Sequence, residues 1–115
     1  MKNLKTFFEF INEAKLPYSI EKVMQSADLN WSEDKKGSKD LIDEHGKDTT
    51  HAHVYQAKDS NRDVKYTVKT WMNDLQYWLQ LEIDGIVDFV QDYQQTEKRY
   101  YDQDCESILG FQIKN

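Results

Sequence analysis

The most restrictive feature of the sequence is a strict alternation of residue types on both sides of one turn signal. Every second residue from Val64 to Met72, and again from Leu75 to Ile83, belongs to a largely apolar set, and Asn73-Asp74 separates the two runs. A period of two is typical of half-buried strands. We therefore predict an antiparallel hairpin with a two-residue loop. In that register the opposed pairs are Met72 with Leu75, Val68 with Leu79, Tyr66 with Leu81 and Val64 with Ile83.

Alternation before the hairpin predicts a third strand over residues 51–58, closed by the turn residues Asp59-Ser60-Asn61-Arg62. A turn centred on Ser60-Asn61 pairs Ala57 with Val64, Tyr55 with Tyr66 and His53 with Val68. After the hairpin, Asp84-Gly85 is a second turn signal, because both residues tolerate positive φ.

Residues 86–90 carry β-branched and aromatic residues and favour a fourth strand. A helix start is the alternative, because Ile86, Phe89, Val90 and Tyr93 also have helical spacing. The segment from Gln94 to Leu109 is predicted as a helix with Gly110 as its C-cap.

Two helices are expected before the sheet. Helical spacing of apolar residues predicts one from Asn3 to Lys15 and another from Ser19, which we expect as its cap. Residues 31–50 are rich in mixed charge and favour an exposed loop, with Ser38 capping at most a single turn that ends at Gly46. The expected fold is thus one α+β domain over residues 1–115, with two N-terminal helices, an antiparallel meander of three to four strands and a C-terminal helix.

Net charge and cysteine content limit the classes of function that the chain can have. The chain of 115 residues has a net charge of −6 and a pI near 5.0. Direct binding to nucleic acid relies on clustered Lys and Arg, whereas an acidic surface suits a basic protein partner. One cysteine allows no internal disulfide, and no apolar stretch reaches signal-peptide or bilayer-spanning length. We therefore expect a cytoplasmic protein that binds neither membranes nor nucleic acid directly.

Residues that could carry catalysis or bind metal are few. His51 and His53 would share one strand face, which makes them weak candidates for metal ligands, with His53 at the core edge as the alternative. Cys105 lies on the apolar side of the predicted last helix, which favours a structural thiol. The sequence contains no nucleophile elbow or glycine-rich phosphate loop. We therefore predict no catalytic residues, no cofactor and no enzyme.

The polar face of the predicted sheet is unusual because it carries two tryptophans, Trp71 and Trp78. In the predicted register Lys69 lies beside Trp78 as a cation–π pair and Lys65 beside Glu82 as an ion pair. Two explanations stay open: a helix covers this face as a second, smaller core, or the face binds a partner. A late acidic and tyrosine-rich run adds a second candidate surface. The predicted partner-binding residues are Trp71, Trp78, Lys69, Glu82, Asp88, Asp92, Tyr100, Tyr101, Asp102 and Asp104.

These features favour a non-enzymatic acidic protein that inhibits or modulates a basic, nucleic-acid-handling partner. The profile is similar, in size and charge alone, to phage anti-restriction and anti-CRISPR proteins and to immunity proteins of nuclease toxins, and no site is transferred from it. One alternative is a metal- or small-ligand-binding domain or enzyme with a pocket near His51, His53 and Tyr77. The other is a homo-oligomer that buries the tryptophan-bearing sheet face.

Overall fold

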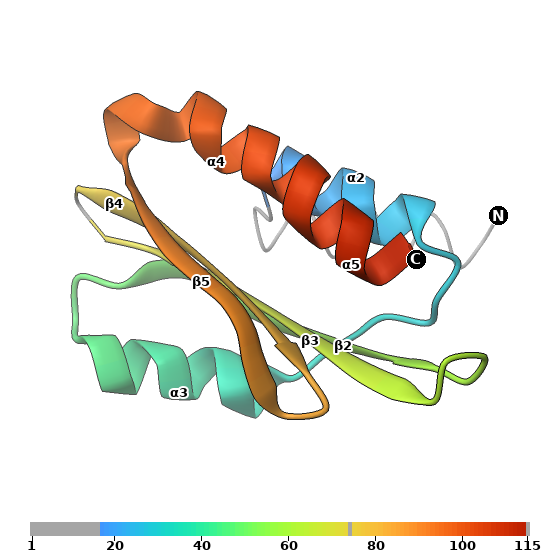
Figure 1. The fold of residues 1–115 in the computed structure, drawn as a ribbon. Helices are drawn as coiled ribbons and strands as arrows, with labels where there is room; N and C mark the ends of the chain where they lie inside the picture. Colours follow the sequence, from blue (N-terminus) through green and yellow to red (C-terminus); the bar gives the residue numbers. More distant parts are fainter. Residues whose placement is uncertain (1–16, 74, 115) are drawn as a thin grey trace, which may run out of the picture.

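A computed structural model describes residues 17–73 and 75–114, which form one antiparallel sheet between two helical layers (Figure 1). The strands are β1 (Ser32–Glu33), β2 (Thr50–Asp59), β3 (Val64–Met72), β4 (Gln76–Ile83) and β5 (Ile86–Gln94). They lie in the order of the sequence, each paired with the next. The α+β class and the meander are confirmed, with five strands in place of three to four.

Helices α2 (Tyr18–Ser26), α4 (Lys98–Asp104) and α5 (Gly110–Lys114) cover one face of the sheet, and α3 (Lys35–His45) covers the other (Figure 1). A 3₁₀ turn, η1 (Gln95–Glu97), precedes α4, and a π-helical segment, η2 (Cys105–Leu109), joins α4 to α5. Among these helices, none is long and apolar enough to cross a membrane. The helix predicted from Asn3 to Lys15 lies outside the described residues.

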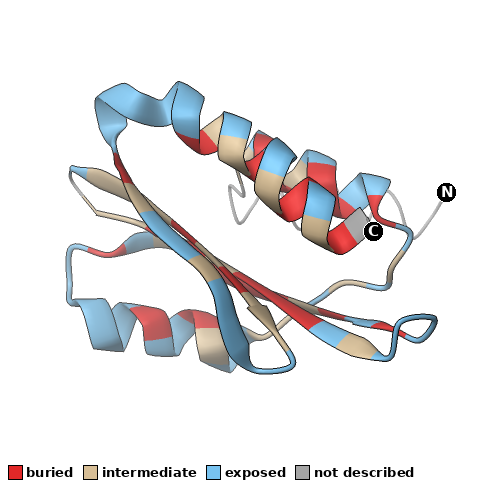
Figure 2. Cartoon of the chain, in the orientation of Figure 1, coloured by how far each residue is buried: buried red, intermediate tan, exposed pale blue. Residues whose placement is uncertain are grey.

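The main core lies between the sheet and the layer of α2, α4 and α5, whose inner sides are buried (Figure 2). Tyr101 lies near its centre, where its ring meets Tyr93 edge-on at 5.5 Å and its hydroxyl is 2.7 Å from Thr70 Oγ1. Burial of such apolar and aromatic side chains is the main stabilising term of a small domain. The buried members of this core are Ile20, Val23, Met24, Ala27, Tyr55, Tyr66, Val68, Leu79, Leu81, Tyr93, Tyr101, Cys105, Leu109 and Ile113.

Both predicted registers are wrong by two residues, and the predicted faces are nevertheless retained. Between β3 and β4 the pairs are Tyr66 with Ile83, Val68 with Leu81, Thr70 with Leu79 and Met72 with Tyr77. Between β2 and β3 they include Tyr55 with Val68 and Ala57 with Tyr66. A shift of two preserves the inward or outward direction of every side chain, because the strand period is two.

The β3–β4 loop is longer than predicted because a side chain organises it. Asn73 Oδ1 accepts hydrogen bonds from the backbone N–H groups of Leu75 (2.9 Å) and Gln76 (2.8 Å). This is the local capping that asparagine provides in turns. Leu75 is consequently outside the β3–β4 ladder, and its side chain is 74% exposed. By contrast, the predicted turn at Asp84-Gly85 is confirmed, with φ of 52° and 80° and Ile83 paired with Ile86.

Three helix boundaries differ from those predicted. Pro17 occupies the N-cap of α2, and Ser19 is buried inside the first turn. β5 continues to Gln94, so the last helix starts later than predicted, and residues 86–90 are strand as favoured. Gly110 has helical φ and ψ of −60° and −42° and lets the helix continue.

Candidate functional site

The region predicted as an exposed loop closes one edge of the sheet instead. Residues 31–50 contain β1 and α3, whose N-cap is Asp34, with Oδ1 accepting from the N–H of Gly37 at 2.9 Å. The predicted single turn capped by Ser38 is therefore a helix of 11 residues in which Ser38 is internal and buried. The expected end at Gly46 is confirmed by the position of the C-cap.

Ser38 and Asp34 attach α3 directly to β2. The N–H of Val54 donates to Ser38 Oγ at 2.9 Å, and the N–H of Asp34 donates to the carbonyl of Val54 at 2.8 Å. Ser38 Oγ itself donates to the carbonyl of Asp34 at 3.1 Å. Both backbone groups of Val54 that face away from β3 are thereby satisfied, which removes this position as a template for another strand.

Under α3 lies a second, smaller core formed by Leu41, Val54 and Trp71, with Ala52 and Trp78 packed against it. Trp71 is 4% exposed, and its ring stacks on His45 at 4.6 Å and on Trp78 at 5.6 Å. Of the two explanations for the tryptophans, helical cover therefore holds for Trp71. Its predicted role in direct partner contact conflicts with this burial, whereas Trp78 is only half-buried.

The ion pair on this face joins different residues from those predicted. Lys69 Nζ lies 2.7 Å from Glu82 Oε2, and both side chains are largely buried. Lys65 and Lys69 were predicted to contact Glu82 and Trp78 respectively, but in the actual register Thr67 is opposite Glu82 and Trp71 is opposite Trp78. Gln80 Nε2 adds a hydrogen bond to Glu82 Oε2 at 2.8 Å.

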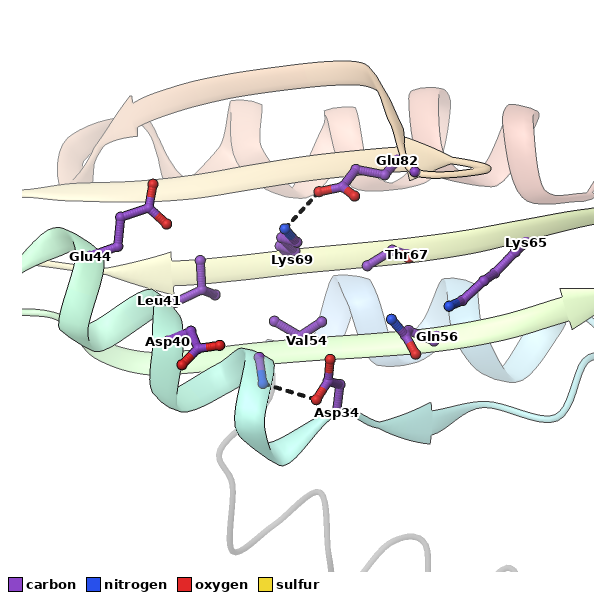
Figure 3. A pocket seen from close by; sticks show the side chains of 12 residues that line it. Asp34, Asp40, Leu41, Glu44, Val54, Gln56, Lys65, Thr67, Lys69 and Glu82 are labelled. Atoms are coloured by element: carbon purple, nitrogen blue, oxygen red, sulfur yellow. Dashed lines mark hydrogen bonds and ion pairs between the residues drawn. The ribbon is translucent and has the colours of Figure 1, made fainter.

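A cavity of about 330 Å³ lies between α3 and the strands around this ion pair (Figure 3). A second cavity of about 210 Å³ shares Leu41, Glu44 and Lys69 with it and extends along Trp78 and Val90. We call the two together the α3 groove. Its wall of Asp34, Asp40 and Glu44 faces the ion pair, so the groove is polar at one end and aromatic at the other.

The α3 layer leaves the β4–β5 half of this sheet face open. Val87 and Val90 on β5 pair with Glu82 and Gln80 on this face, and their side chains are 50% and 47% exposed. Most of β5 is exposed in Figure 2. Neighbouring large apolar side chains on an exposed surface typically mark an interaction site.

Acidic residues are concentrated around this open half. Residues 70–97, which span β4 and β5, contain six Asp or Glu and no Lys, Arg or His, while the rest of the chain carries 15 acidic and 15 basic residues. In the sequence, the net charge of −6 is therefore contained in this segment, and in the structure one of its carboxylates, that of Glu82, is paired with Lys69 just outside it. Asp88 is exposed on β5, and Asp92 lies opposite Trp78 and accepts from Gln76 Nε2 at 2.8 Å. Counting charge by segment, in place of the whole chain, would have revealed this concentration from the sequence.

The predicted residues on the last helix do not join this surface, because α4 lies on the opposite face of the sheet from α3 (Figure 1). Tyr101 is buried in the main core, so its predicted contact role conflicts with its position. Asp102 pairs with Lys98 at 2.9 Å, and Asp104 accepts from Tyr93 Oη at 2.6 Å. Tyr100 is 46% exposed and stacked with Arg99. The ten predicted residues thus divide between two faces.

The candidates for metal binding and nucleophilic chemistry are separated from the α3 groove. His51 has a φ of 50° at an irregularity in β2, so the alternation that would align it with His53 is broken. His53 is buried, with Nδ1 3.8 Å from Glu33 Oε2. Within residues 17–73 and 75–114, no group of three His, Cys, Asp or Glu side chains comes together as a metal site. Burial raises the pKa of Cys105 to about 12, so it remains a thiol at neutral pH.

Comparison with known proteins assigns the chain to no family. Searches of protein-family models, curated proteins and solved structures returned no match to the chain.

Proposed function

We propose that the chain is a non-enzymatic protein-binding module that inhibits or modulates a basic, nucleic-acid-handling partner. The observation that supports this most strongly is the half-covered sheet face. Val87 and Val90 are exposed on the strand next to that of Trp78, and all three lie in the segment that holds six acidic residues and no basic one. We call the surface formed by Trp78, Val87, Asp88, Val90 and Asp92 the β5 patch.

The composition of the β5 patch matches what protein interfaces require. Aromatic and apolar side chains supply contact area, and half-buried Trp78 is already oriented by its stacking on Trp71, so little side-chain entropy is lost on binding. Uncompensated carboxylates add attraction and orientation for a positively charged partner. Proteins that handle nucleic acids carry such basic surfaces.

The experiment is capture from a lysate of the source cells on immobilised protein, compared across two charge-reversal variants. Asp88→Lys alters the β5 patch, whereas Asp28→Lys makes the same change in the exposed connection between α2 and β1, at the other edge of the sheet. We expect a basic protein to be retained at low salt and released at about 0.5 M salt, where the Debye length is only a few ångströms.

Asp88→Lys should weaken retention at least tenfold, and Asp28→Lys should leave it within twofold. The nucleic-acid-dependent activity of the captured protein should fall when the chain is added. Retention of nothing beyond background at low salt, or equal retention by the two variants, would refute the proposal.

A further inference from the structure

We propose that β5 binds its partner by strand addition, taking an extended segment with Lys or Arg at alternate positions as a sixth strand of the sheet. This inference rests on the proposed function and specifies how that same surface would be used. Strand addition to an exposed edge uses main-chain hydrogen bonds for affinity and alternate side chains for specificity.

The first support is that β5 is an open edge of useful length. It has nine residues, and within the described part of the chain it pairs with β4 alone. A bulge leaves Asp88 without a partner on β4, and the six residues from Phe89 to Gln94 continue beyond it in one unbroken register. In Figure 1 it runs along the near edge of the sheet, and no labelled helix crosses it. Long edge strands with exposed apolar residues are usually shortened, covered or blocked in monomeric proteins.

The direction of the backbone groups of β5 follows from the hydrogen bonds of the sheet. The N–H of Gln95 donates to the carbonyl of Leu75 at 3.0 Å, which continues the register that pairs Gln94 with Gln76. Hydrogen-bonded and non-hydrogen-bonded pairs alternate along an antiparallel ladder. The N–H and C=O groups of Val90 and Asp92 therefore point away from β4, toward the open edge. There the C=O of Asp92 accepts a hydrogen bond from the exposed side chain of Gln91 at 3.1 Å, which an added strand would displace.

The side chains of the same two residues determine which segment fits. Val90 and Asp92 are paired with Gln80 and Trp78, which places them on the face that carries the α3 groove. An added strand would present one side chain opposite Asp92 and another, two residues away, opposite Val90. A basic residue at the first position and an apolar residue at the second complement this edge.

Charge complementarity distinguishes a foreign basic segment from a second copy of the chain. Asp84, Asp88 and Asp92 recur every four residues along the β4–β5 turn and β5, with no basic residue between positions 70 and 97. Pairing two β5 strands would bring these carboxylates together, and like charges across strands are destabilising. A segment that carries lysine or arginine would instead be attracted by the same carboxylates.

The test uses capped peptides of about seven residues, the usual length of a strand. Valine is placed between two lysines on one face, and threonine fills the other positions. A matched peptide carries glutamate in place of lysine. We expect the lysine peptide to bind at least tenfold more tightly, measured by titration calorimetry at low salt. In the complex, the amide protons of Val90 and Asp92 should exchange at least tenfold more slowly than in the free protein.

The contribution of main-chain hydrogen bonds is measured separately from that of side chains by methylating alternate backbone nitrogens of the lysine peptide. Methylation of one set should reduce affinity at least tenfold, and methylation of the other set should leave it nearly unchanged, because only one set faces β5. Val90→Pro should weaken binding at least tenfold relative to Val90→Ala, because the proline variant alone lacks the outward N–H.

Equal affinity of the two methylated peptides would overturn strand addition while leaving partner binding through side chains intact. Capture of a partner in the lysate experiment together with no binding of the lysine peptide would do the same. Protection of Val90 and Asp92 in the protein alone, with sedimentation as a dimer, would assign the edge to a second copy and also overturn the inference. Failure of the lysate capture itself would instead refute the proposed function.

Discussion

The two edges of the sheet are treated in opposite ways. At the β2 edge, a two-residue strand and the start of α3 satisfy the outward backbone groups of Val54, and the second core lies directly beneath that helix. At the β5 edge, the described chain supplies no such cover, and exposed valines lie among carboxylates. The contrast indicates that very little apolar sequence is enough to close an edge of this sheet, and the open edge at β5 is the observation on which the proposed strand addition rests.

The largest effect is expected from removing the side chain that fixes α3 to the closed edge. Leu41 is 5% exposed in the second core, and Leu41→Ala should lower the free energy of unfolding by about 2–5 kcal/mol. Urea unfolding followed by tryptophan fluorescence measures the loss. Ile42→Ala on the next, exposed position is the control and should cost no more than about 0.5 kcal/mol. Equal losses would show that α3 does not depend on this contact.

A smaller effect is expected from removing the hydrogen bond that closes the β2 edge. Ser38→Ala leaves the buried N–H of Val54 without its acceptor and should cost about 1–3 kcal/mol. The same unfolding measurement applies. Ser60→Ala, in the exposed β2–β3 turn, serves as the control and should leave the free energy of unfolding nearly unchanged. If Ser38→Ala leaves the free energy of unfolding unchanged, this edge is closed by packing alone.

The third prediction compares two neighbouring positions on the open edge. Gln91→Pro removes an N–H that points toward β4 and should cost about 1–3 kcal/mol. Val90→Pro removes an outward N–H and should cost less than about 1 kcal/mol. Thermal and urea unfolding of the two variants gives the comparison directly. The reverse order would show that the amide directions assigned to β5 are wrong.

The smallest effect concerns a carboxyl group at the closed edge. Burial is the main cause that raises the pKa of Glu33 above its ordinary value near 4.5. The folded state therefore favours the protonated form, so ionisation of Glu33 lowers stability as pH rises above the unfolded-state pKa. Glu33→Gln should stabilise the protein by less than about 1 kcal/mol at pH near 7 and by almost nothing at pH near 4.

Urea unfolding at the two pH values measures this difference, and Glu44→Gln, an exposed carboxyl on α3, controls for the loss of one charge. A loss of stability in Glu33→Gln at neutral pH would mean that the contact of Glu33 with His53 outweighs the burial of its charge.

Sequence patterns predicted the meander and its two faces because alternation is set locally, residue by residue. The registers were missed because loop geometry depends on side-chain hydrogen bonds such as those of Asn73, which composition does not reveal. The face assignments survived because both errors equalled the strand period.

The cover of the second face could not be predicted from periodicity. The side of α3 that faces the sheet contains one buried leucine and one buried serine. The helix is attached to β2 by hydrogen bonds to Val54. Such a helix has the composition of a loop, since its apolar stripe is almost absent. For the candidate site, Trp78 and the β5 carboxylates were identified from the sequence, but their separation from the α4 residues required the three-dimensional arrangement.

The π-helical segment η2 has a consequence for the length of the C-terminal helix. The buried residues Tyr101, Cys105, Leu109 and Ile113 follow each other at intervals of four, and an α-helix would rotate each of them by about 40° relative to the one before. The wider turn of η2 cancels that drift. The segment therefore accommodates about one residue more than an unbroken α-helix needs to connect the same buried positions. Deleting a single exposed residue there, such as Ser107, should yield a continuous α-helix that still buries Ile113.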